Sequence, residues 1–236
     1  MSRYLALVPA AGVGSRFGAG RPKQYVEIAG RCVLEHTVRR LLAEPQIDRV
    51  AVVVAPQDEW YAQAVRLPES LAARVTLLRC GGESRAASVF NGLNALLAQG
   101  LAGSEDRILV HDAARCCLPR SALRRLLDQA GSHPAGGILA LPVADTLKRA
   151  AEGGAIAATV PRAGLWQAQT PQLFRAGLLQ QALSSKDFAA ITDEASAVER
   201  LGVQPLLVEG DSRNLKMTLP QDEYIVRLLL AAEQAA

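Results

Sequence analysis

Residues 5–18 read LALVPAAGVGSRFG, an apolar run of strand length that stops at Pro9 and continues into small residues and glycines. The run Leu5–Val8 is hydrophobic throughout, as expected of a strand that is covered on both faces. The glycines that follow let the backbone approach a ligand closely, and successive N–H groups in such a loop can cradle phosphates. The stretch therefore predicts a buried strand with a ligand-binding loop at its carboxyl end.

Five more runs of similar length and character follow along the chain. They are Val50–Val54, Val75–Leu78, Ile108–Val110, Ile138–Leu141 and Val203–Val208. Between them, apolar residues recur at helical spacing, as in Val89, Phe90, Leu93, Leu96 and Leu97, in Leu123, Leu126 and Leu127, and, after Pro220, in Tyr224, Ile225, Leu228 and Leu229. This alternation predicts a Rossmann-like α/β fold, with a mostly parallel sheet and helices on both faces.

The segment 142–162 departs from this alternation. Two extended runs flank a turn at Gly153-Gly154, which is typical of a β-hairpin. We interpret residues 1–236 as one domain with a protruding β-hairpin arm at about 142–162. The residues alone leave open whether the arm has a role or is a surface excursion.

Composition narrows the classes of partner. The net charge is only +3 and aromatic residues make up 4% of the chain, whereas a nucleic-acid groove needs clustered Lys and Arg with interleaved aromatics. We therefore expect no nucleic-acid partner, and no membrane partner either, because no apolar run reaches spanning length. Cys32, Cys80, Cys116 and Cys117 form no C-x-x-C spacing, which favours free thiols in a reducing cytoplasm.

The loop after the first strand is the first candidate site, because ligands of open parallel sheets sit beyond the carboxyl ends of the strands. It is not a dinucleotide fingerprint, since the third glycine of G-x-G-x-x-G would fall at Phe17, and no P-loop pattern can be read. A tight structural turn would explain the glycines alone. Arg16 and Lys23 add two cations beside the loop, which favours a triphosphate ligand.

The loop after Ile108–Val110 is the second candidate. There, Asp112 precedes Arg115 by three residues, so the carboxylate could hold Mg²⁺ or a sugar hydroxyl while the guanidinium takes a phosphate. A local ion pair between these two side chains is the alternative. His111, alone beside a strand end, is interpreted as a structural group.

Three further segments can reach the same edge of the sheet. Gly81-Gly82 precedes a predicted helix and could receive an anion or a base edge, although Ser84 could equally be just an N-cap. Lys216 follows the last predicted strand and is another candidate cation. Residues 192–194 resemble a helix cap with acidic residues in the first turn.

Taken together, these loops resemble the 2-C-methyl-D-erythritol 4-phosphate cytidylyltransferases of the non-mevalonate isoprenoid pathway, a family with a nucleotidyltransferase-type fold. Any one motif is modest, but eight in order over nearly the whole chain are specific. The motifs are PAAGVGSR (9–16), PKQ (22–24), Gly81-Gly82 with Arg85 and Ser88, VHDAAR (110–115), PVADTLK (142–148), LWQAQTPQ (165–172), TDEA (192–195) and NLKMT (214–218).

The resemblance implies a role for each matching residue. Nucleotide binding is expected of Pro9, Ala10, Ala11, Gly12, Gly14, Arg16, Lys23, Gly82, Glu83 and Ser88. Acceptor binding is expected of Asp112, Arg115, Thr146, Arg162, Thr170, Thr192 and Lys216. The catalytic cations would be Arg16, Lys23 and Lys216. Glu83 stands where the family carries an aspartate, so we expect backbone groups to lead in reading the base.

The same resemblance implies a cofactor and a partner. Mg²⁺, or another divalent cation such as Mn²⁺, would be held mainly by the phosphates of CTP, with Asp112 as a candidate protein ligand. The arm would cross to a second subunit and deliver Thr146 and Arg162 into its acceptor site, which makes the enzyme a homodimer.

The expected chemistry needs no general base, because a phosphate oxygen of the acceptor is already ionised at neutral pH. This agrees with a chain that holds only three histidines, none in a convincing dyad. Positioning and positive charge would do the catalytic work instead. The alternatives are an enzyme that uses ribitol 5-phosphate as acceptor, a nucleotide sensor without turnover, and an oxidoreductase, which Phe17 disfavours.

Overall fold

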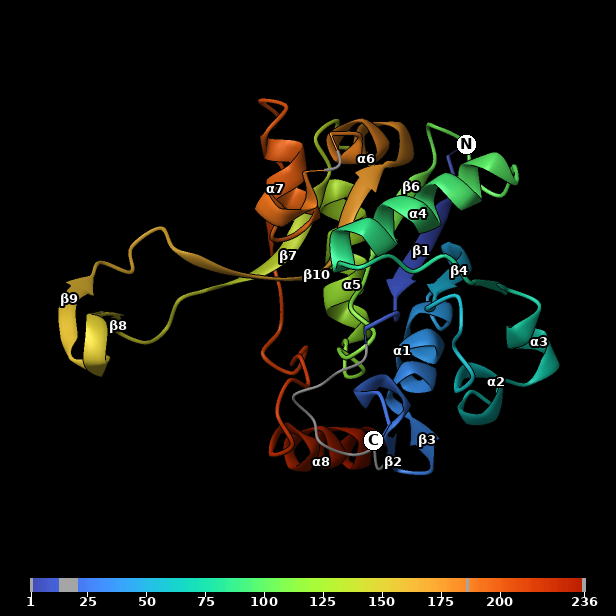
Figure 1. The fold of residues 1–236 in the computed structure, drawn as a ribbon, viewed down its shortest axis with the longest axis horizontal. Coiled ribbons are helices and arrows are strands. Elements are labelled where there is room, and N and C mark those ends of the chain that lie inside the picture. The colour runs from blue at the N-terminus through green and yellow to red at the C-terminus, as the bar shows by residue number, and fades with distance from the viewer. Residues whose placement is uncertain (1, 13–20, 186, 235–236) are drawn as a thin grey trace.

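The computed structural model describes residues 2–12, 21–185 and 187–234, and its core is a seven-stranded sheet. Figure 1 shows the sheet at the centre of the body. The strand order is β11 (Leu206–Glu209), β7 (Gly137–Pro142), β10 (Trp166–Arg175), β6 (Arg107–Val110), β1 (Tyr4–Pro9), β4 (Ile47–Val53) and β5 (Val75–Leu78). All six runs predicted as strands overlap strands of this sheet. The predicted mostly parallel α/β fold is therefore confirmed.

The strand that the sequence did not reveal is β10, which runs antiparallel between β6 and β7. Its first three residues are exposed and the next six are buried, so it shows neither a continuous apolar run nor a clean alternation. Pro171 lies inside it, at a break in the register with β7 between Ala168 and Gln172. Proline and polar residues in the middle of a run are typical of a loop, and only the tertiary context makes this segment a strand.

Helices cover both faces of the sheet because side chains of each strand alternate between the faces. On one face, Ala6 and Val8 of β1 join the cluster of buried residues that packs under α1 (Val33–Leu42) and α5 (Arg120–Ala130). On the other face, Leu5 and Leu7 join the cluster of buried residues under α4 (Arg85–Ala98), α6 (Ala176–Leu183) and α7 (Glu194–Glu199).

The last helix, α8 (Asp222–Gln234), packs on a smaller cluster beside the short hairpin of β2 (Glu27–Ile28) and β3 (Arg31–Cys32). The remaining elements are short: α2 (Tyr61–Ala64), α3 (Glu69–Ala72), and the 3-10 helices Lys23–Tyr25, Glu152–Gly154 and Phe188–Ala190. No described helix combines the length and the apolar character needed to cross a membrane. The four cysteines are free.

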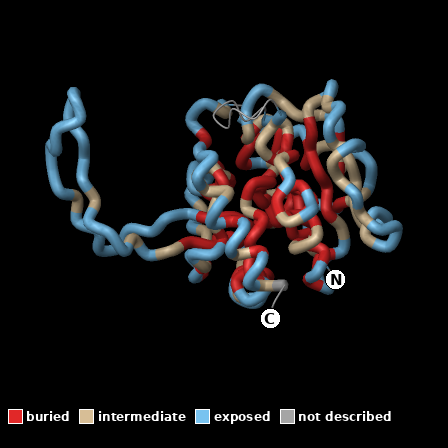
Figure 2. Tube along the Cα trace, turned by 90° about the horizontal axis from the view of Figure 1, so that it is seen from below, coloured by how far each residue is buried: buried red, intermediate tan, exposed pale blue. Residues whose placement is uncertain are grey.

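The arm predicted at about 142–162 is a two-stranded hairpin of β8 (Leu147–Ala150) and β9 (Ile156–Val160). It turns through Gly153 and Gly154, whose φ angles of 80° and 83° lie in the left-handed region that favours glycine. The hairpin stands away from the body (Figure 1), and almost all of it is exposed (Figure 2).

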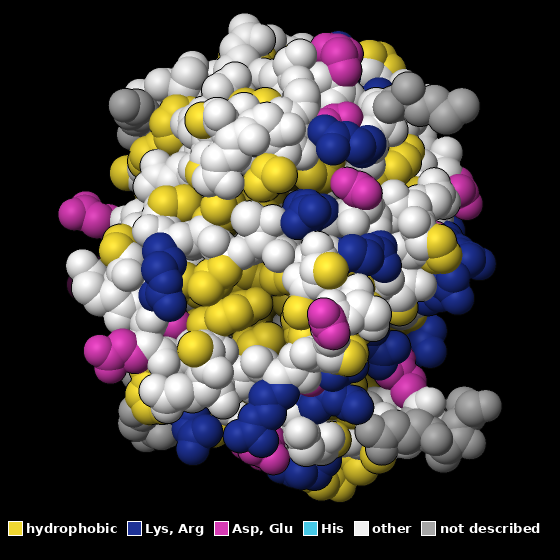
Figure 3. All heavy atoms as spheres, turned by 90° about the vertical axis from the view of Figure 1, so that its right-hand side faces the viewer, with side chains coloured by type: hydrophobic (Ala, Val, Ile, Leu, Met, Phe, Trp, Pro, Cys, Tyr) yellow, Lys and Arg dark blue, Asp and Glu magenta, His cyan; other side chains and the backbone are white. Residues whose placement is uncertain are grey.

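Charged side chains are mixed on the face that is turned towards the viewer in Figure 3. Lys and Arg gather towards the lower part of this face with Asp and Glu among them, and a hollow in the middle is lined by hydrophobic side chains. Charged side chains are also paired with buried partners, as in Arg39, whose Nε lies 2.8 Å from Oε1 of Glu35.

Candidate functional site

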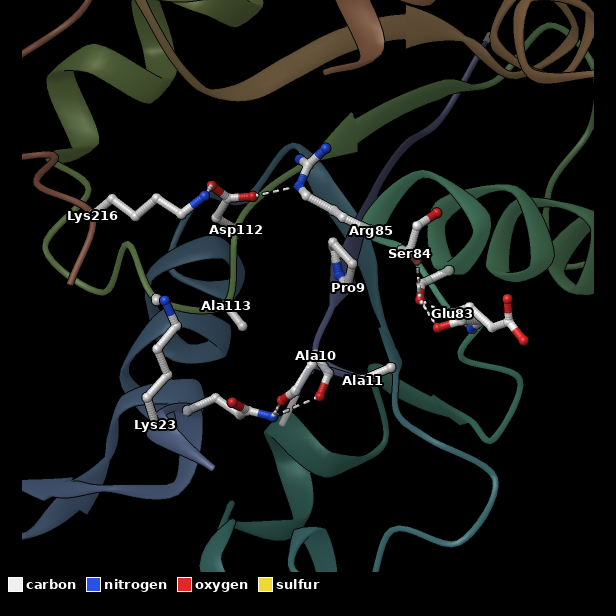
Figure 4. A pocket seen from close by; sticks show the side chains of 15 residues that line it. Pro9, Ala10, Ala11, Lys23, Glu83, Ser84, Arg85, Asp112, Ala113 and Lys216 are labelled. Carbon is white, nitrogen blue, oxygen red and sulfur yellow. Dashed lines mark hydrogen bonds and ion pairs between the residues drawn. The ribbon is translucent and has the colours of Figure 1, made fainter. Parts of the chain in front are cut away.

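A cavity of about 400 Å³ lies where the loops after β1, β5 and β6 meet (Figure 4). It brings together most of the residues predicted to bind the nucleotide, together with two predicted to bind the acceptor. These residues are Pro9, Ala10, Ala11, Gly12, Lys23, Gly82, Glu83 and Ser88, with Asp112 and Lys216. Two predicted residues, Gly14 and Arg16, lie outside the described part of the chain.

The loop that follows β1 is held in place by a buried side-chain amide. Nε2 of Gln24 donates to the carbonyl oxygens of Ala10 at 2.8 Å and Gly12 at 2.9 Å. Its neighbour Lys23 extends towards the cavity and donates from Nζ to the carbonyl oxygen of Met217 at 3.0 Å. The motif containing Gln24 was recognised in the sequence, but its support of the loop was not predicted.

The loop that precedes α4 needs its two glycines because the backbone comes close to its neighbours. A Cβ on Gly82 would lie 2.7 Å from Cβ of Ala87, and one on Gly81 would lie 2.9 Å from the carbonyl oxygen of Val54. The hydroxyl of Ser88 accepts a hydrogen bond from N–H of Gly82 at 3.0 Å and so fixes this loop.

Ser84 and Glu83 lie in the same loop but have different surroundings. Ser84 caps α4, since its Oγ accepts from N–H of Ala87 at 3.1 Å, and the interpretation of Ser84 as an N-cap is confirmed. Glu83 is exposed, and Figure 4 shows its carboxylate pointing away from the other labelled side chains. Backbone groups are thus better placed than this carboxylate to face a ligand in the cavity.

Asp112 is the centre of charge in the site. Its Oδ1 lies 2.8 Å from Nε of Arg85 and its Oδ2 lies 2.8 Å from Nζ of Lys216. Burial opposes ionisation, but Arg85 and Lys216 outweigh it and hold the pKa of Asp112 far below its usual range. The predicted local pair with Arg115 is longer, at 3.7 Å. Asp112 is therefore an anion whose two oxygens are both occupied by cations.

A second cavity of about 290 Å³ adjoins the first, and Arg85, Asp112 and Lys216 line both. These three side chains form the wall between the two cavities. Arg115, Thr170 and Thr192, all predicted to bind the acceptor, line the second cavity as well. The remaining acceptor residues, Thr146 and Arg162, are exposed on the arm and line neither cavity of this chain.

His111 and Thr170 support the backbone of the loop that carries Asp112. Nε2 of His111 lies 3.0 Å from the carbonyl oxygen of Arg115, which can only accept, so this nitrogen carries the proton. Its Nδ1 then accepts from the hydroxyl of Thr170 at 3.0 Å, and the same hydroxyl accepts from N–H of Asp112 at 3.0 Å.

Burial lowers the pKa of His111 to about 4, so the ring is neutral near pH 7. The interpretation of His111 as a structural group is confirmed by these contacts. The proton of the Thr170 hydroxyl is already used within the protein, which leaves this residue as a support of the site rather than a donor to a ligand.

The acidic residues at the start of α7 divide into two roles. Asp193 caps the helix as predicted, because its Oδ1 accepts from N–H of Ser196 at 2.9 Å. Glu194 turns inward instead and is only 1% exposed. Its two oxygens receive Nη1 and Nη2 of Arg85 at 2.7 and 3.0 Å, a bidentate pair that the sequence did not reveal.

The charges of this pair support each other. Burial alone would lower the pKa of the Arg85 guanidinium, but Glu194 and Asp112 outweigh it and raise that pKa above its ordinary value. Burial raises the pKa of Glu194 even against the pull of Arg85, so this carboxylate depends on Arg85 for its negative charge.

The described residues offer no ready site for a resident metal ion, since they contain no group of three or more His, Cys, Asp or Glu side chains that could hold one. Asp112 already holds Lys216 and Arg85, so a metal ion at this carboxylate would share it with these two cations. The donor set therefore fits a metal ion that arrives with its own phosphate ligands better than one held by the protein.

Comparison with known proteins agrees with this geometry. Residues 4–232 match the family model described as 2-C-methyl-D-erythritol 4-phosphate cytidylyltransferase. Proteins of that name from Neisseria meningitidis serogroup C (strain 053442) and Laribacter hongkongensis (strain HLHK9) are 59% identical over 230 residues and 56% identical over 235 residues. The alignments cover 98% of this chain and 98% of the first relative, and 100% of this chain and 99% of the second.

Solved structures give the same result. A crystal structure of a 4-diphosphocytidyl-2C-methyl-D-erythritol synthase is 55% identical and superposes with a TM-score of 0.85, covering 98% of this chain and 99% of that one. The Francisella tularensis 2-C-methyl-D-erythritol 4-phosphate cytidylyltransferase is 31% identical with a TM-score of 0.81, covering 97% and 100%. The chain belongs to the 2-C-methyl-D-erythritol 4-phosphate cytidylyltransferase family.

Proposed function

We propose that this protein transfers CMP from CTP to 2-C-methyl-D-erythritol 4-phosphate, giving 4-diphosphocytidyl-2-C-methyl-D-erythritol and pyrophosphate for isoprenoid precursor synthesis. Beyond the family, one observation carries the proposal. Two adjoining cavities share a wall of Arg85, Asp112 and Lys216, as expected where two phosphate-bearing substrates meet. The first cavity suits the nucleotide and the second suits the acceptor.

In the first cavity, the loop 9–12 and the loop before α4 would receive CTP. The backbone of Gly82 and the start of α4 would face the base and ribose, and Lys23 would face the triphosphate. Arg16, which lies outside the described residues, is proposed as the second cation there. In the second cavity, Arg115 and Lys216 would bind the acceptor phosphate, and Asp112 would bind its hydroxyls.

The reaction forms one P–O bond and breaks another. An ionised phosphate oxygen of the acceptor attacks the α-phosphorus of CTP in line, and pyrophosphate leaves with the electrons of the broken bond. No proton has to be removed, which suits a site whose nearest histidine, His111, is buried and bonded on both ring nitrogens. Lys23 and Lys216 would stabilise the charge that develops on the transferred group.

Mg²⁺ is proposed as part of the nucleotide substrate, bound mainly by the phosphates of CTP. The occupied oxygens of Asp112 support this assignment over a metal site built by the protein. When bound, the ion would neutralise phosphate charge. Asp112 remains a candidate ligand of the ion, beside the cations that it already holds.

The arm is proposed to pair with a second copy of the chain, making a homodimer. An isolated two-stranded hairpin is marginally stable in water, yet this one stands away from the body with Ile156 67% exposed and Trp166 near its base 39% exposed. A partner subunit would cover these side chains. Thr146 and Arg162 would then reach the partner's acceptor cavity, which accounts for their absence from both cavities of their own chain.

Two broader interpretations go with this proposal. The first strand of the chain, β1, and the last, β11, belong to the same sheet. This supports one cytidylyltransferase domain over residues 1–236 with an arm at about 142–162. The four free cysteines support a cytoplasmic location, where thiols stay reduced.

The test is pyrophosphate release by the purified protein with Mg²⁺ and pairs of substrates. We expect release with CTP and 2-C-methyl-D-erythritol 4-phosphate, and little with ATP, GTP or UTP in place of CTP. Release with ribitol 5-phosphate in preference to the methylerythritol phosphate would show that ribitol 5-phosphate is the acceptor. Binding of CTP without any release would contradict the proposed reaction and favour a nucleotide sensor.

A further inference from the structure

Glu194 is a buried carboxylate for which the reaction proposed above has no direct use. It is not among the described residues that line either cavity, and the cap of its helix is supplied by Asp193. A buried carboxylate is costly unless it is paired and hydrogen-bonded. The role of the Glu194 carboxylate must therefore lie in its pairing with Arg85.

The geometry of the pair fixes the direction of the Arg85 side chain. A guanidinium is a rigid plane with five N–H donors, so a bidentate bond through Nη1 and Nη2 sets where Nε points. With both terminal nitrogens on Glu194, Nε is directed at Oδ1 of Asp112, 2.8 Å away. Glu194 thus bonds Arg85 of the wall directly and reaches Asp112 through this one side chain.

Arg85 in turn determines which oxygen of Asp112 is available to the other cations, because its Nε bonds Oδ1. Only Oδ2 of Asp112 is left for Lys216 at 2.8 Å and Arg115 at 3.7 Å. If Arg85 lost its anchor, it could turn both terminal nitrogens onto Asp112, or leave it. Either change would rotate the carboxylate and alter the position of the two cations proposed to receive the acceptor phosphate.

We propose that Glu194 is a positioning residue for the acceptor site: it holds Arg85, and through Arg85 it orients Asp112 beside Lys216 and Arg115. The inference rests on the proposed function, since it takes the second cavity as the acceptor site. It goes further by tying a buried residue of α7, which lines neither cavity, to acceptor affinity more than to nucleotide affinity.

A purely electrostatic role makes the opposite prediction. Arg85, Arg115 and Lys216 carry three positive charges against two negative charges on Asp112 and Glu194. Replacing Glu194 by glutamine removes a negative charge, and net charge alone would make the acceptor phosphate bind more tightly. Positioning makes it bind more weakly.

The experiment measures the Kd of 2-C-methyl-D-erythritol 4-phosphate by calorimetry, with Mg²⁺ and saturating α,β-methylene-CTP, which cannot turn over. We compare the wild type with Glu194→Gln, Arg85→Lys and the double variant. We expect Glu194→Gln to raise the acceptor Kd about tenfold or more, in line with loss of a charged hydrogen-bond partner, and to leave the Kd of the CTP analogue within about twofold. The double variant should be no weaker than Arg85→Lys alone, because Glu194 acts only through Arg85.

The matched control is Glu199→Gln, which removes an exposed charge from the same helix and should leave the acceptor Kd unchanged. Should Glu194→Gln fail to fold, the apolar pair Arg85→Met with Glu194→Leu replaces it, since buried ion pairs are often exchanged for apolar pairs without loss of stability. That variant should also bind the acceptor weakly and the CTP analogue normally.

An unchanged or lower acceptor Kd in Glu194→Gln, or additive losses in the double variant, would overturn the inference. Pyrophosphate release by the wild type is measured in parallel and separates this failure from that of the proposed function. A wild type that binds the acceptor but does not release pyrophosphate contradicts only the reaction. A wild type that does not bind the acceptor contradicts both.

Discussion

Nζ of Lys216 lies 2.8 Å from Oδ2 of Asp112, although the two residues follow different strands of the sheet. Asp112 is the second residue after β6 and Lys216 comes after β11, and the pair lines both cavities. The carboxylate holds a cation that the acceptor phosphate would compete for. This relationship places the proposed chemistry at one wall and makes the roles of the surrounding cations testable.

Lys23→Ala should lower turnover on the order of 10²–10³-fold, the typical cost of removing one preorganised charge that stabilises a transition state. Its side chain lines the first cavity and is only partly buried, so the fold should be retained. The rate of pyrophosphate release at saturating substrates measures the effect, and circular dichroism checks the fold. Arg227→Gln, which removes an exposed cation of α8, is the control that should keep its rate. Turnover of Lys23→Ala within about threefold of the wild type would argue against the role of Lys23.

Gly82→Ala should weaken CTP binding because the added Cβ would lie 2.7 Å from Cβ of Ala87 and push the loop away from the cavity. Overpacking of this kind costs about 1–3 kcal/mol, so we expect CTP affinity to fall about fivefold or more. Gly103→Ala is the same substitution at a position where the nearest atom to the new Cβ, an oxygen of Asp106, is 3.8 Å away. Equal CTP affinities of the two variants in calorimetry would show that the close approach at Gly82 does not matter.

The free energy of unfolding should decrease as the pH is lowered through the range in which His111 takes up a proton on unfolding. Its folded pKa of about 4 lies below the unfolded value of about 6.5, so protonation favours the unfolded state. The contribution of this residue is therefore complete above about pH 6.5 and is lost progressively as the pH falls towards 4. From one such proton we expect a loss of about 2 kcal/mol between pH 7 and pH 5.

Urea unfolding at both pH values measures this loss in the wild type and in His111→Asn. The variant should be less stable at pH 7, because it loses a ring that bonds Thr170 and the carbonyl of Arg115. It should lose less stability than the wild type between pH 7 and pH 5. Equal losses in both proteins would mean that His111 is not the residue responsible.

Subunit exchange tests whether the arm completes the acceptor site of the partner subunit. Arg162→Ala should impair the acceptor site of the partner subunit, and Lys23→Ala should impair the nucleotide site of its own subunit. In a heterodimer of the two variants, one of the two sites would keep both residues intact. We therefore expect each heterodimer to have up to about half the activity of a wild-type dimer, whereas each variant alone stays nearly inactive. Verified heterodimers without any recovery would indicate that each chain completes its own site.

Much of the fold could be predicted from hydrophobic pattern because the buried strands are covered on both faces. Runs such as Ile108–Val110 are apolar throughout and correspond to β6, whose four residues are all buried. β10 could not be predicted in this way. Two of its three glutamines, Gln169 and Gln172, are buried and bonded to groups far along the chain, such as Nε2 of Gln172 to Oδ2 of Asp193 at 2.8 Å, and no local pattern predicts this.

The site likewise has a part that could be predicted from the sequence and a part that could not. Loops at the carboxyl ends of strands could be predicted, because parallel strands bring those ends to one edge of the sheet. The pairing of Arg85 with Glu194 could not, since it joins residues 109 positions apart, and an acidic residue after an N-cap is usually explained by the helix dipole. The arm residues Thr146 and Arg162 remain predictions, because one chain does not bring them to either cavity.

The most direct test of the central claim uses acceptor labelled with ¹⁸O in its phosphate group. If a phosphate oxygen of 2-C-methyl-D-erythritol 4-phosphate attacks the α-phosphorus of CTP across the wall of Arg85, Asp112 and Lys216, all of the label stays in the cytidine diphosphate product. Mass spectrometry should then find every ¹⁸O in 4-diphosphocytidyl-2-C-methyl-D-erythritol and none in pyrophosphate. Label in the pyrophosphate, or an unlabelled CMP released without a joined product, would contradict the account.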